Sequence, residues 1–569
     1  MPASLVALSL LLLTSSNQTM PRQTDNRLVP FIDRLRTDLD ELRSFYDLPT
    51  SAETSSRMDS FFAGEGQALQ AFAGLKRNSE EEVDYALSDK FLSYRRKQIE
   101  IELGKVKETE ALLPFAGEIL ALETDRRKLL PIDEEKAADK LTQIAKDVKA
   151  VRESLQKAID SKGKLPSAVL ADRSAKRLDR LNQTLDFWFK QYDGFNPLFS
   201  WWTKKPYDAL ATSLRDYSKF LKEKLAGYRE GEDPPLIGDP IGREALLVDI
   251  DAEMLDKSPE DLLKMADEEF VWCEKEIKAA SRQMGFGDDW KKAMEKVKSL
   301  HVQPGEQDQL VAAQAKEAIK YVEDHDLVTI EPLCKETWRV EMLNQETQKV
   351  LPFAVYLGQR MGVSFPLSTQ DHETKEMSLR GNNEHFTRAI TFHELIPGHH
   401  LQGYMAERYN SHRRLFSTPF LVEGWALYWE MLLWDLGFPR GPEDKIGMLF
   451  WRMHRCARII VSLKFHLGQM KPTEMIDFLV DRVGHERFTA TSEVRRFIGG
   501  DYSPLYQCAY MIGGLQIREL KKELVDGKKM SLKEFHDAVL HSGPIPIKWI
   551  GNRLRHMESP AKGSNRRYL

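Results

Sequence analysis

Apolar residues recur every three or four positions through most of the N-terminal half of this chain. From Leu28 to about Glu230 this spacing predicts long amphipathic helices, because residues three and four apart share one face of an α-helix. One apolar stripe comprises Phe31, Leu35, Leu39, Leu42 and Phe45, and another Leu178, Leu181, Leu185 and Trp188. Turns are expected near residues 47–49, 161–163 and 194–197. No fixed-period repeat interrupts this helical pattern.

The pattern changes at residues 231–240, which are rich in proline, glycine and acidic residues. This composition predicts a boundary between an N-terminal helical region, residues 26–235, and a second region, residues 240–569. Helices resume after the boundary, and Ser258 followed by Pro259 is a typical helix start. Two short strand-like segments, residues 353–356 and 362–367, lie further on. The predicted fold class is therefore all-α, mostly long helices, with one small β-sheet.

Aromatic residues gather in the N-terminal half, at residues 187–189 and 199–202. They would either pack between helices or line a substrate cleft, and the pattern alone leaves both interpretations open.

Composition excludes some classes of function. The chain has 569 residues, a formal net charge of −5 and a pI of about 6.3, so it lacks the basic character of a nucleic-acid-binding protein. Its four cysteines are far apart and have no Cys-x-x-Cys spacing, which excludes a zinc ribbon or a dense disulfide framework.

Residues 1–25 contain an apolar run, residues 5–13, that is too short to span a membrane. It suits the apolar part of a signal peptide, although the basic n-region and a clear cleavage site are missing. The segment is either a signal peptide, which would make the protein periplasmic or extracellular, or a disordered leader of a cytoplasmic protein. No later segment is long and apolar enough to be predicted as a membrane span.

The clearest chemical motif is residues 391–402, with His393-Glu394 followed by Pro397-Gly398-His399-His400. In the zinc-hydrolase motif H-E-x-x-H, two histidines one turn apart bind the metal and the glutamate is the general base. Here six residues separate His393 from His399, about 600° of regular helix, so the two side chains would diverge. Pro397 cannot donate a helical hydrogen bond and Gly398 accepts unusual dihedral angles. We therefore predict that residues 395–398 interrupt the helix and bring His399 to His393.

Glu423 is the expected third ligand, because it lies in an apolar, aromatic segment where a buried carboxylate needs a partner. Two histidines, one glutamate and an open position are typical of catalytic Zn²⁺. We predict His393, His399 and Glu423 as metal ligands, with His400 as the alternative to His399, and Glu394 as the catalytic base. The alternative is that His399 and His400 are surface residues and Glu423 is an acid at a helix start.

The motif H-E-x-x-P-G-H-H-x-Q followed by E-G-W-A-x-Y resembles the bacterial "domain of unknown function 885" family, which itself resembles the gluzincin zinc metallopeptidases. The resemblance is clear over about residues 240–555. Within this range it includes residues 452–458, 506–513, 535–537 and 543–546. One departure is Pro504-Leu505-Tyr506, where the family often has Pro-Gly-Gln.

This resemblance implies a gluzincin-like architecture with a central cleft, helices of both regions around the metal, and an edge strand that binds extended substrate. The alternative for the strand is an ordinary small sheet without a role in binding. The resemblance also favours two further catalytic residues, Tyr510 as a donor to the oxyanion and Arg458 as a partner for a substrate carboxylate or as a support for the residues around the metal. The alternative is that Tyr510 is a buried tyrosine bonded to the backbone and Arg458 forms a structural ion pair.

The expected function is that of a zinc metallopeptidase that cleaves peptide bonds, with a peptide or small amide as substrate. Two alternatives remain, a metal-dependent hydrolase of non-peptide amides and a helical binding protein with a vestigial metal site. The intact Glu394 argues against the binding protein, which would not need a base.

Overall fold

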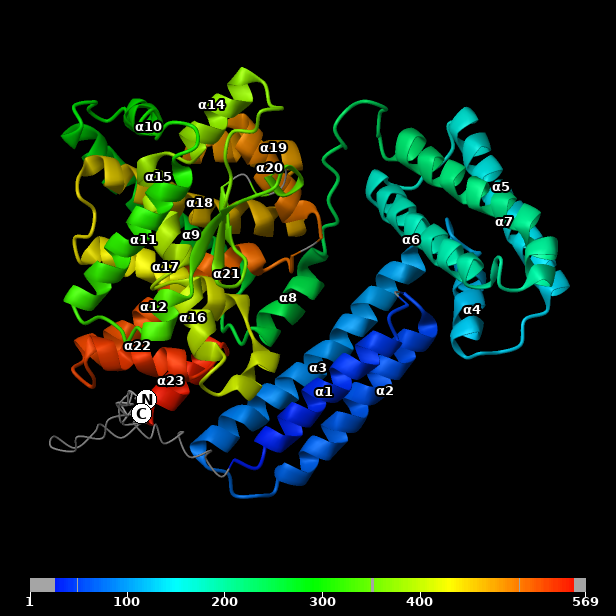
Figure 1. Ribbon diagram of the computed structural model, residues 1–569, viewed down its shortest axis with the longest axis horizontal. Helices are drawn as coiled ribbons and strands as arrows, with labels where there is room; N and C mark the ends of the chain where they lie inside the picture. Colours follow the sequence, from blue (N-terminus) through cyan, green and yellow to red (C-terminus); the bar gives the residue numbers. More distant parts are fainter. Residues whose placement is uncertain (1–25, 49, 349–350, 352, 501, 557–569) are drawn as a thin grey trace, which may run out of the picture.

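The computed structural model describes residues 26–556 except 49, 349, 350, 352 and 501, so the predicted leader, residues 1–25, lies outside the described residues. The chain is mostly helical with one small sheet, as predicted. Figure 1 shows three parts: an arm of long helices, a bundle set apart at the upper right, and a larger body.

The arm consists of long helices that lie side by side (Figure 1). Its elements are α1 (Val29–Phe45), α2 (Ala52–Leu69), η1 (Gln70–Phe72) and α3 (Ser79–Glu108). The predicted stripe of α1 is buried at Phe31, Leu35 and Leu39, but Phe45 is exposed. Helix α3 begins with a capping box between Asn78 and Glu81, which satisfies backbone N–H groups of its first turn.

The bundle has its own hydrophobic core. Its elements are α4 (Ala116–Arg127), α5 (Glu134–Asp160), α6 (Ala168–Tyr192), α7 (Pro197–Phe220) and η2 (Leu221–Leu225). Leu141 and Ile144 of α5 and the predicted stripe of α6, including Leu181 and Leu185, are buried in this core. The aromatic cluster is divided, because Trp188, Phe189 and Phe199 are buried here whereas Phe187, Trp201 and Trp202 are exposed.

The body carries the predicted metal motif. Its helices are α8 (Gly242–Ala252), α9 (Pro259–Gln283), α10 (Trp290–Lys298), α11 (Gln307–Asp324), α12 (Pro332–Glu336), α13 (Gln345–Gln348), α14 (His372–Gly381), α15 (Glu384–Glu394), α16 (His399–Ala406), η3 (Ser411–Phe416), α17 (Pro419–Asp435), α18 (Pro442–His466), α19 (Pro472–Phe478), η4 (Leu479–Val483), α20 (Arg487–Ile498), α21 (Tyr506–Lys521), η5 (Lys522–Asp526), α22 (Leu532–His541) and α23 (Ile547–Arg555). Ser258 and Pro259 start α9 as predicted. Almost every residue of α18 is buried, so the arginines on this helix lie in the interior.

The sheet has the strand order β1-β3-β2, with strands β1 (Arg339–Met342), β2 (Ala354–Tyr356) and β3 (Arg360–Val363). β3 pairs in parallel with β1 and antiparallel with β2. The first predicted strand is present as β2, β3 begins and ends earlier than predicted, and β1 was not anticipated. As the last strand in the order, β2 has one edge that no other strand of the sheet covers.

The hydrophobic cores divide the chain differently from the predicted regions 26–235 and 240–569. The arm shares the core of the body, whereas the bundle does not. A buried salt bridge reinforces the connection of arm and body, in which Arg413 Nε of η3 donates to Asp84 Oδ1 of α3 at 2.6 Å. Hydrophobic burial therefore unites segments that the proline-rich boundary separates in the sequence.

Candidate metal centre

The helix that carries the motif is interrupted where predicted. α15 ends at Glu394 and α16 begins at His399, and Leu395 and Gly398 between them depart from helical dihedral angles. The Gly398 N–H donates to the Phe392 carbonyl at 3.0 Å. A side chain at Gly398 is excluded, because a Cβ atom there would lie 1.8 Å from the carbonyl oxygen of His393.

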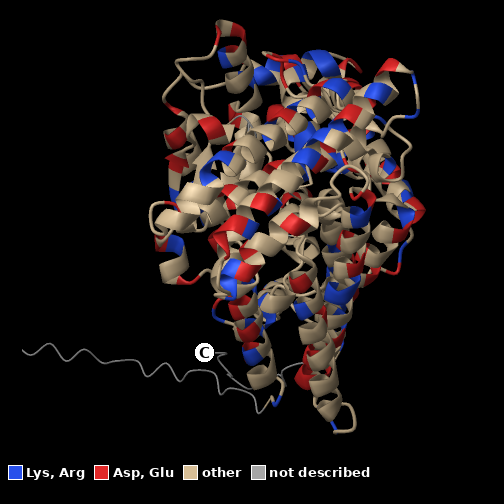
Figure 2. Ribbon diagram, turned by 90° about the vertical axis from the view of Figure 1, so that its right-hand side faces the viewer, with Lys and Arg blue, Asp and Glu red and all other residues tan. Residues whose placement is uncertain are grey.

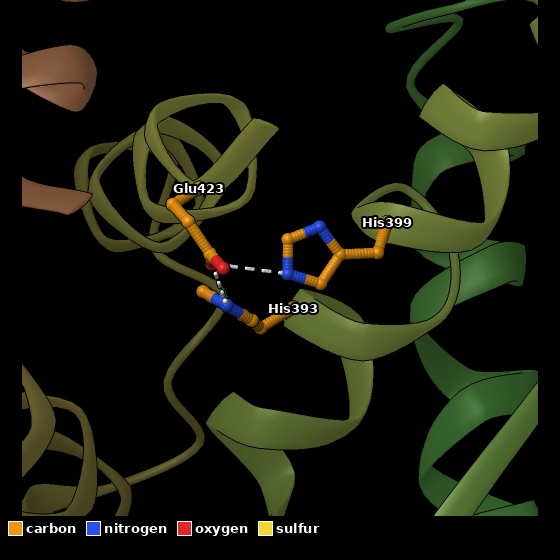
Figure 3. Close-up of side chains that lie close together, drawn as sticks. All are labelled: His393, His399 and Glu423. Atoms are coloured by element: carbon orange, nitrogen blue, oxygen red, sulfur yellow. Dashed lines mark ion pairs between the residues drawn. The ribbon is translucent and has the colours of Figure 1, made fainter. Parts of the chain in front are cut away.

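The interruption brings His393, His399 and Glu423 together (Figure 3). Glu423 Oε2 lies 3.6 Å from His393 Nε2 and 3.2 Å from His399 Nε2. One potential ligand atom from each residue lies within 4.8 Å of those of the other two. All three side chains are at least nine-tenths buried. The structure therefore brings together the three residues predicted as ligands, and their role in metal binding stays a prediction.

His400, the alternative ligand, points elsewhere. Its Nε2 donates to the carbonyl of Cys334 at 2.9 Å, and its Nδ1 lies 3.3 Å from the hydroxyl of Tyr356. Burial lowers the pKa of His400, so the ring is neutral and both of its nitrogens have protein partners.

Glu430, which was not predicted from the sequence, is the second carboxylate beside His393. Its Oε1 accepts a hydrogen bond of 2.7 Å from His393 Nδ1. Nδ1 therefore carries a proton, and Nε2 is the ring nitrogen that faces Glu423. Glu430 follows Glu423 by two helical turns, so both lie on one face of α17. The spacing of two turns between Glu423 and Glu430, within an otherwise apolar helix, is the pattern in the sequence that indicates Glu430 as a residue of the site.

Close packing of α17 against α21 completes the surroundings of Glu423. A Cβ atom at Gly424 would lie 2.6 Å from Gly513 backbone atoms, and one at Gly513 would lie 1.9 Å from the Phe420 carbonyl oxygen, so only glycine allows this approach. The contact brings Tyr506 of α21 to Glu423, and the Tyr506 hydroxyl donates to Glu423 Oε1. One carboxylate oxygen of Glu423 is therefore held by Tyr506, and the other faces the histidines.

The electrostatics of the three residues are strongly coupled. Burial would raise the pKa of Glu423, but the adjacent His399 and His393 outweigh burial and hold it well below its usual value. Burial would likewise lower the pKa of His393, but the carboxylates of Glu423 and Glu430 raise it to about 9. The site thus favours positive charge between the imidazoles and Glu423.

The donor atoms fit a bound cation. Glu423 Oε2 is buried and accepts no hydrogen bond from the described residues. It faces Nε2 of both His393 and His399, so positive charge between these three atoms, from ring protons or from a metal ion, compensates the buried carboxylate. Two imidazole nitrogens and one carboxylate oxygen are also the donors that zinc prefers.

These residues lie in the wall of a cavity of about 470 Å³. Glu394 lines this cavity beside His393 and His399, and Phe353 to Tyr356 of the sheet region line it from another side. Among the described residues, its lining comes from residues 351–544 alone. The expectation that helices of both regions surround the site was therefore wrong, and so was the interpretation of residues 187–189 and 199–202 as cleft-lining. The aromatic residues lie in the separate bundle, where they form its core and surface.

Tyr510 and Arg458 line the same cavity. The Tyr510 ring is stacked 6.1 Å from the ring of His393, and burial raises the pKa of the phenol. Arg458 Cζ lies 4.5 Å from the Tyr510 ring centroid, and its Nη2 donates to Glu493 Oε2 at 3.1 Å. Glu493 was not anticipated, because it lies seventy residues beyond Glu423 and no local pattern connects the two.

A model of the family described as "Bacterial protein of unknown function (DUF885)" matches residues 46–554. The chain belongs to the DUF885 family. The match includes most of the arm and all of the bundle, so these parts belong to the family's architecture as well. No curated protein matches the sequence.

Two solved structures share the fold of this DUF885 protein. One is from Shewanella oneidensis and is described as a "putative lipoprotein of unknown function", with a TM-score of 0.65, 18% identity, and 92% of this chain and 99% of that chain covered. The other is a "putative lipoprotein" from Colwellia psychrerythraea, with a TM-score of 0.58, 16% identity, and coverage of 93% and 98%. At such low identity these similarities establish the fold alone.

Two general features of the described residues are the hydropathy of the helices and the distribution of charged residues. No helix among the described residues is both long and apolar enough to cross a bilayer. Figure 2 shows ribbon segments with acidic and with basic residues interspersed along the described helices.

Proposed function

We propose that this protein is a zinc-dependent peptidase. The observation that carries the proposal is the convergence of His393 Nε2, His399 Nε2 and Glu423 Oε2, with Glu394 in the same cavity wall. This is a gluzincin-like ligand set, and the base that a hydrolase needs directly follows the first ligand in the sequence.

His393, His399 and Glu423 would hold the zinc ion. A zinc ion there would lower the pKa of water and polarise a substrate carbonyl. Glu430 fixes the tautomer of His393 through its hydrogen bond with Nδ1, and Tyr506 holds the other oxygen of Glu423.

Glu394 is the proposed general base. Its carboxylate would accept a proton from the attacking water and deliver it to the leaving amine, which must be protonated as the C–N bond breaks. The Tyr510 hydroxyl is the proposed donor to the oxyanion, because Tyr510 lines the cavity with its ring stacked on that of His393. Tyr506 is not available for this role, since its hydroxyl already donates to Glu423.

The edge strand β2 favours a peptide substrate over other amides. Phe353 and Leu357 exchange backbone hydrogen bonds with the β3 side, Ser364 N to Phe353 O at 2.8 Å and Leu357 N to Arg360 O at 2.7 Å. In an antiparallel pair the alternate residues, Ala354 and Tyr356, direct their backbone groups to the opposite edge. Both residues line the cavity. An extended peptide could therefore pair with β2 and pass the catalytic residues.

We propose that the protein is exported from the cytoplasm. The apolar run at residues 5–13 suits a signal peptide, and both structural neighbours are described as "putative lipoproteins".

Zinc analysis combined with peptide digestion tests the proposal. The wild-type protein should bind about one zinc ion per chain, and His393→Ala should lose it. Glu394→Gln should keep zinc but lose hydrolysis of a peptide library by several orders of magnitude, because it removes the base and leaves the ligands. Metal content is measured by mass spectrometry of purified protein, and cleavage by mass spectrometry of the digest. A Glu394→Gln variant as active as the wild type would contradict the mechanism.

A further inference from the structure

Three arginines line one side of the cavity. Arg455 and Arg458 lie on α18, and Arg496 lies on α20. The side chains of Arg455 and Arg458 are only 5% and 2% exposed, whereas that of Arg496 is 17% exposed and so the most accessible to a ligand. Burial of guanidinium groups is costly unless carboxylates pair with them.

The protein supplies too few carboxylates for these arginines. Glu493 is shared, since its Oε2 accepts from Arg458 Nη2 at 3.1 Å and its Oε1 lies 3.8 Å from Arg496 Nη1. The carboxylate nearest Arg455 is Glu430, at 3.9 Å, and Glu430 already accepts from His393. The three guanidinium groups therefore face one carboxylate, Glu493, that is not committed to the metal centre.

Several N–H groups of these arginines have no hydrogen-bond acceptor among the residues that the structure describes. Nε of each arginine and Nη1 of Arg458 are buried without a hydrogen-bond partner among the described residues. The nearby His454 and His485 do not alter this charge balance, because burial lowers the pKa of both and keeps them neutral. Three guanidinium groups in the wall of one cavity, with Glu493 as the carboxylate they share, indicate that a ligand supplies further negative charge.

The arginines lie a short peptide length from the metal centre. Arg455 Cζ and Arg458 Cζ are both 4.5 Å from the Tyr510 ring centroid, which is 6.1 Å from the ring of His393. At about 3.5 Å per extended residue, an anion at the arginines is no more than about three residues from a bond cleaved beside His393. A cavity of about 470 Å³ is of the size that encloses a small ligand rather than a folded chain.

We propose that the three arginines bind the C-terminal carboxylate of the substrate, so that the enzyme removes one to three residues from the C-terminus of a peptide. This inference rests on the proposed peptidase function and specifies its substrate. A free carboxylate is a planar anion that a guanidinium group binds with two parallel hydrogen bonds. Arg496, the most exposed of the three, makes the first contact with the carboxylate. The same positive charge disfavours a peptide that presents its N-terminal amine to this side.

Matched peptides test the inference. One peptide carries a free C-terminal acid, a second the same sequence with a C-terminal amide, and a third the amide with an internal glutamate. The zinc-loaded wild type should shorten the free acid from its C-terminus and process either amide about 100-fold more slowly, as mass spectrometry of timed digests would show. Equal rates for free acid and amide, or faster cleavage after an internal glutamate, would overturn the C-terminal assignment.

Variants on α20 assign the effect to the arginine. Arg496→Gln should reduce kcat/KM for the free acid by about 10- to 100-fold and reduce that for the amide much less, so that the preference for the acid is lost. Arg496→Lys should recover part of the loss, because it restores the charge without the bidentate geometry. Arg487→Gln is the matched control, since Arg487 begins the same helix with a side chain that is 66% exposed. Identical losses for acid and amide in Arg496→Gln would overturn the proposed contact.

A binding measurement separates this inference from the proposed catalysis. Zinc-loaded Glu394→Gln should bind the free acid at least about tenfold more tightly than the amide in calorimetry. If the wild type cleaves no peptide but this preference holds, the peptidase proposal fails and the carboxylate site stands. If peptides are cleaved internally and the preference is absent, the peptidase proposal stands and the carboxylate site fails.

Discussion

Glu430 controls the chemistry of His393 through a single hydrogen bond. The bond at 2.7 Å to Nδ1 orients the ring and leaves Nε2 as the donor atom toward the proposed metal. The negative charge of Glu430 also makes the imidazole a stronger electron donor. A glutamine at this position could accept the same hydrogen bond but would lack the charge.

We therefore predict that Glu430→Gln weakens zinc binding by about tenfold or more while the fold is retained. Competition with a chromophoric chelator measures the affinity, and circular dichroism checks the fold. Glu407→Gln is the control, because Glu407 lines the same cavity without contacting His393 in the described structure. Equal zinc affinity in Glu430→Gln and the wild type would show that the charge of Glu430 does not matter to the site.

At the residue scale, the sequence was informative where backbone chemistry decides the outcome. Pro397 and Gly398 made an interruption predictable, because one lacks the helical donor and the other accepts a close approach to the His393 carbonyl. Glu493 was unpredictable, since its position depends on the packing of α20 against α18. Arg458 could be placed in the cavity by resemblance, but its salt bridge with Glu493 is visible only in the structure.

At the scale of elements, the start of α17 determines where Glu423 lies. Thr418 caps this helix, as its hydroxyl accepts from the Phe420 N–H at 3.1 Å. The same hydroxyl donates to Glu253, which lies just after α8. Burial and the nearby Asp249 raise the pKa of Glu253 to about 7, although the hydrogen bond from Thr418 opposes the shift. A carboxyl group that resists ionisation therefore contacts the helix that carries Glu423.

This raised pKa predicts a pH-dependent stability. In the unfolded chain Glu253 titrates near its ordinary pKa of 4.5, and in the folded protein near 7. The folded protein therefore holds the Glu253 proton more tightly than the unfolded chain does. The stability gained from this difference is fully present below pH 4.5 and is lost as the pH rises through 7. The loss is on the order of 3 kcal/mol. Glu253→Gln cannot ionise, so it should have a higher Tm than the wild type at pH 8 and a similar Tm at pH 4.5.

Thermal denaturation at the two pH values measures this difference. Asp251→Asn is the matched control, because Asp251 is a nearby acid whose side chain is 74% exposed and pairs with Lys90 at the surface. The control should change Tm little at either pH. A Glu253→Gln variant whose Tm differs from the wild type equally at pH 4.5 and pH 8 would refute the assignment.

Helices were more predictable than strands at this scale. The α6 stripe and the start of α9 follow from local periodicity and capping, which depend on adjacent residues. β1 is four residues long and pairs with β3 across a gap of about twenty residues, so no local pattern identifies it. Strand pairing depends on tertiary contacts more than on intrinsic propensity.

At the scale of the whole molecule, the position of a linker and the boundary of a hydrophobic core are different properties. Residues 226–241 connect the bundle to the body without a helix, as the proline-rich composition predicted. This segment is nevertheless packed, because a side chain at Gly238 would collide with Phe465 of the body. The arm joins the body through Asp84 and Arg413, across more than three hundred residues of sequence. Composition locates the linker, but only packing shows which segments share a core.

Two separate cores predict two separable unfolding steps. Leu181 is 2% exposed in the core of the bundle, and Leu262 is fully buried in the core shared by arm and body. Each leucine-to-alanine change should remove about 2–5 kcal/mol from the core that contains it, through lost contacts and the cavity left behind. Leu181→Ala should therefore lower the temperature of one calorimetric transition, and Leu262→Ala that of the other. Because the predicted zinc ligands all lie in the body, Leu181→Ala should also keep its zinc at temperatures where the bundle has already unfolded. A single transition that shifts as a unit in both variants would show that the bundle and the body unfold together, despite their separate cores.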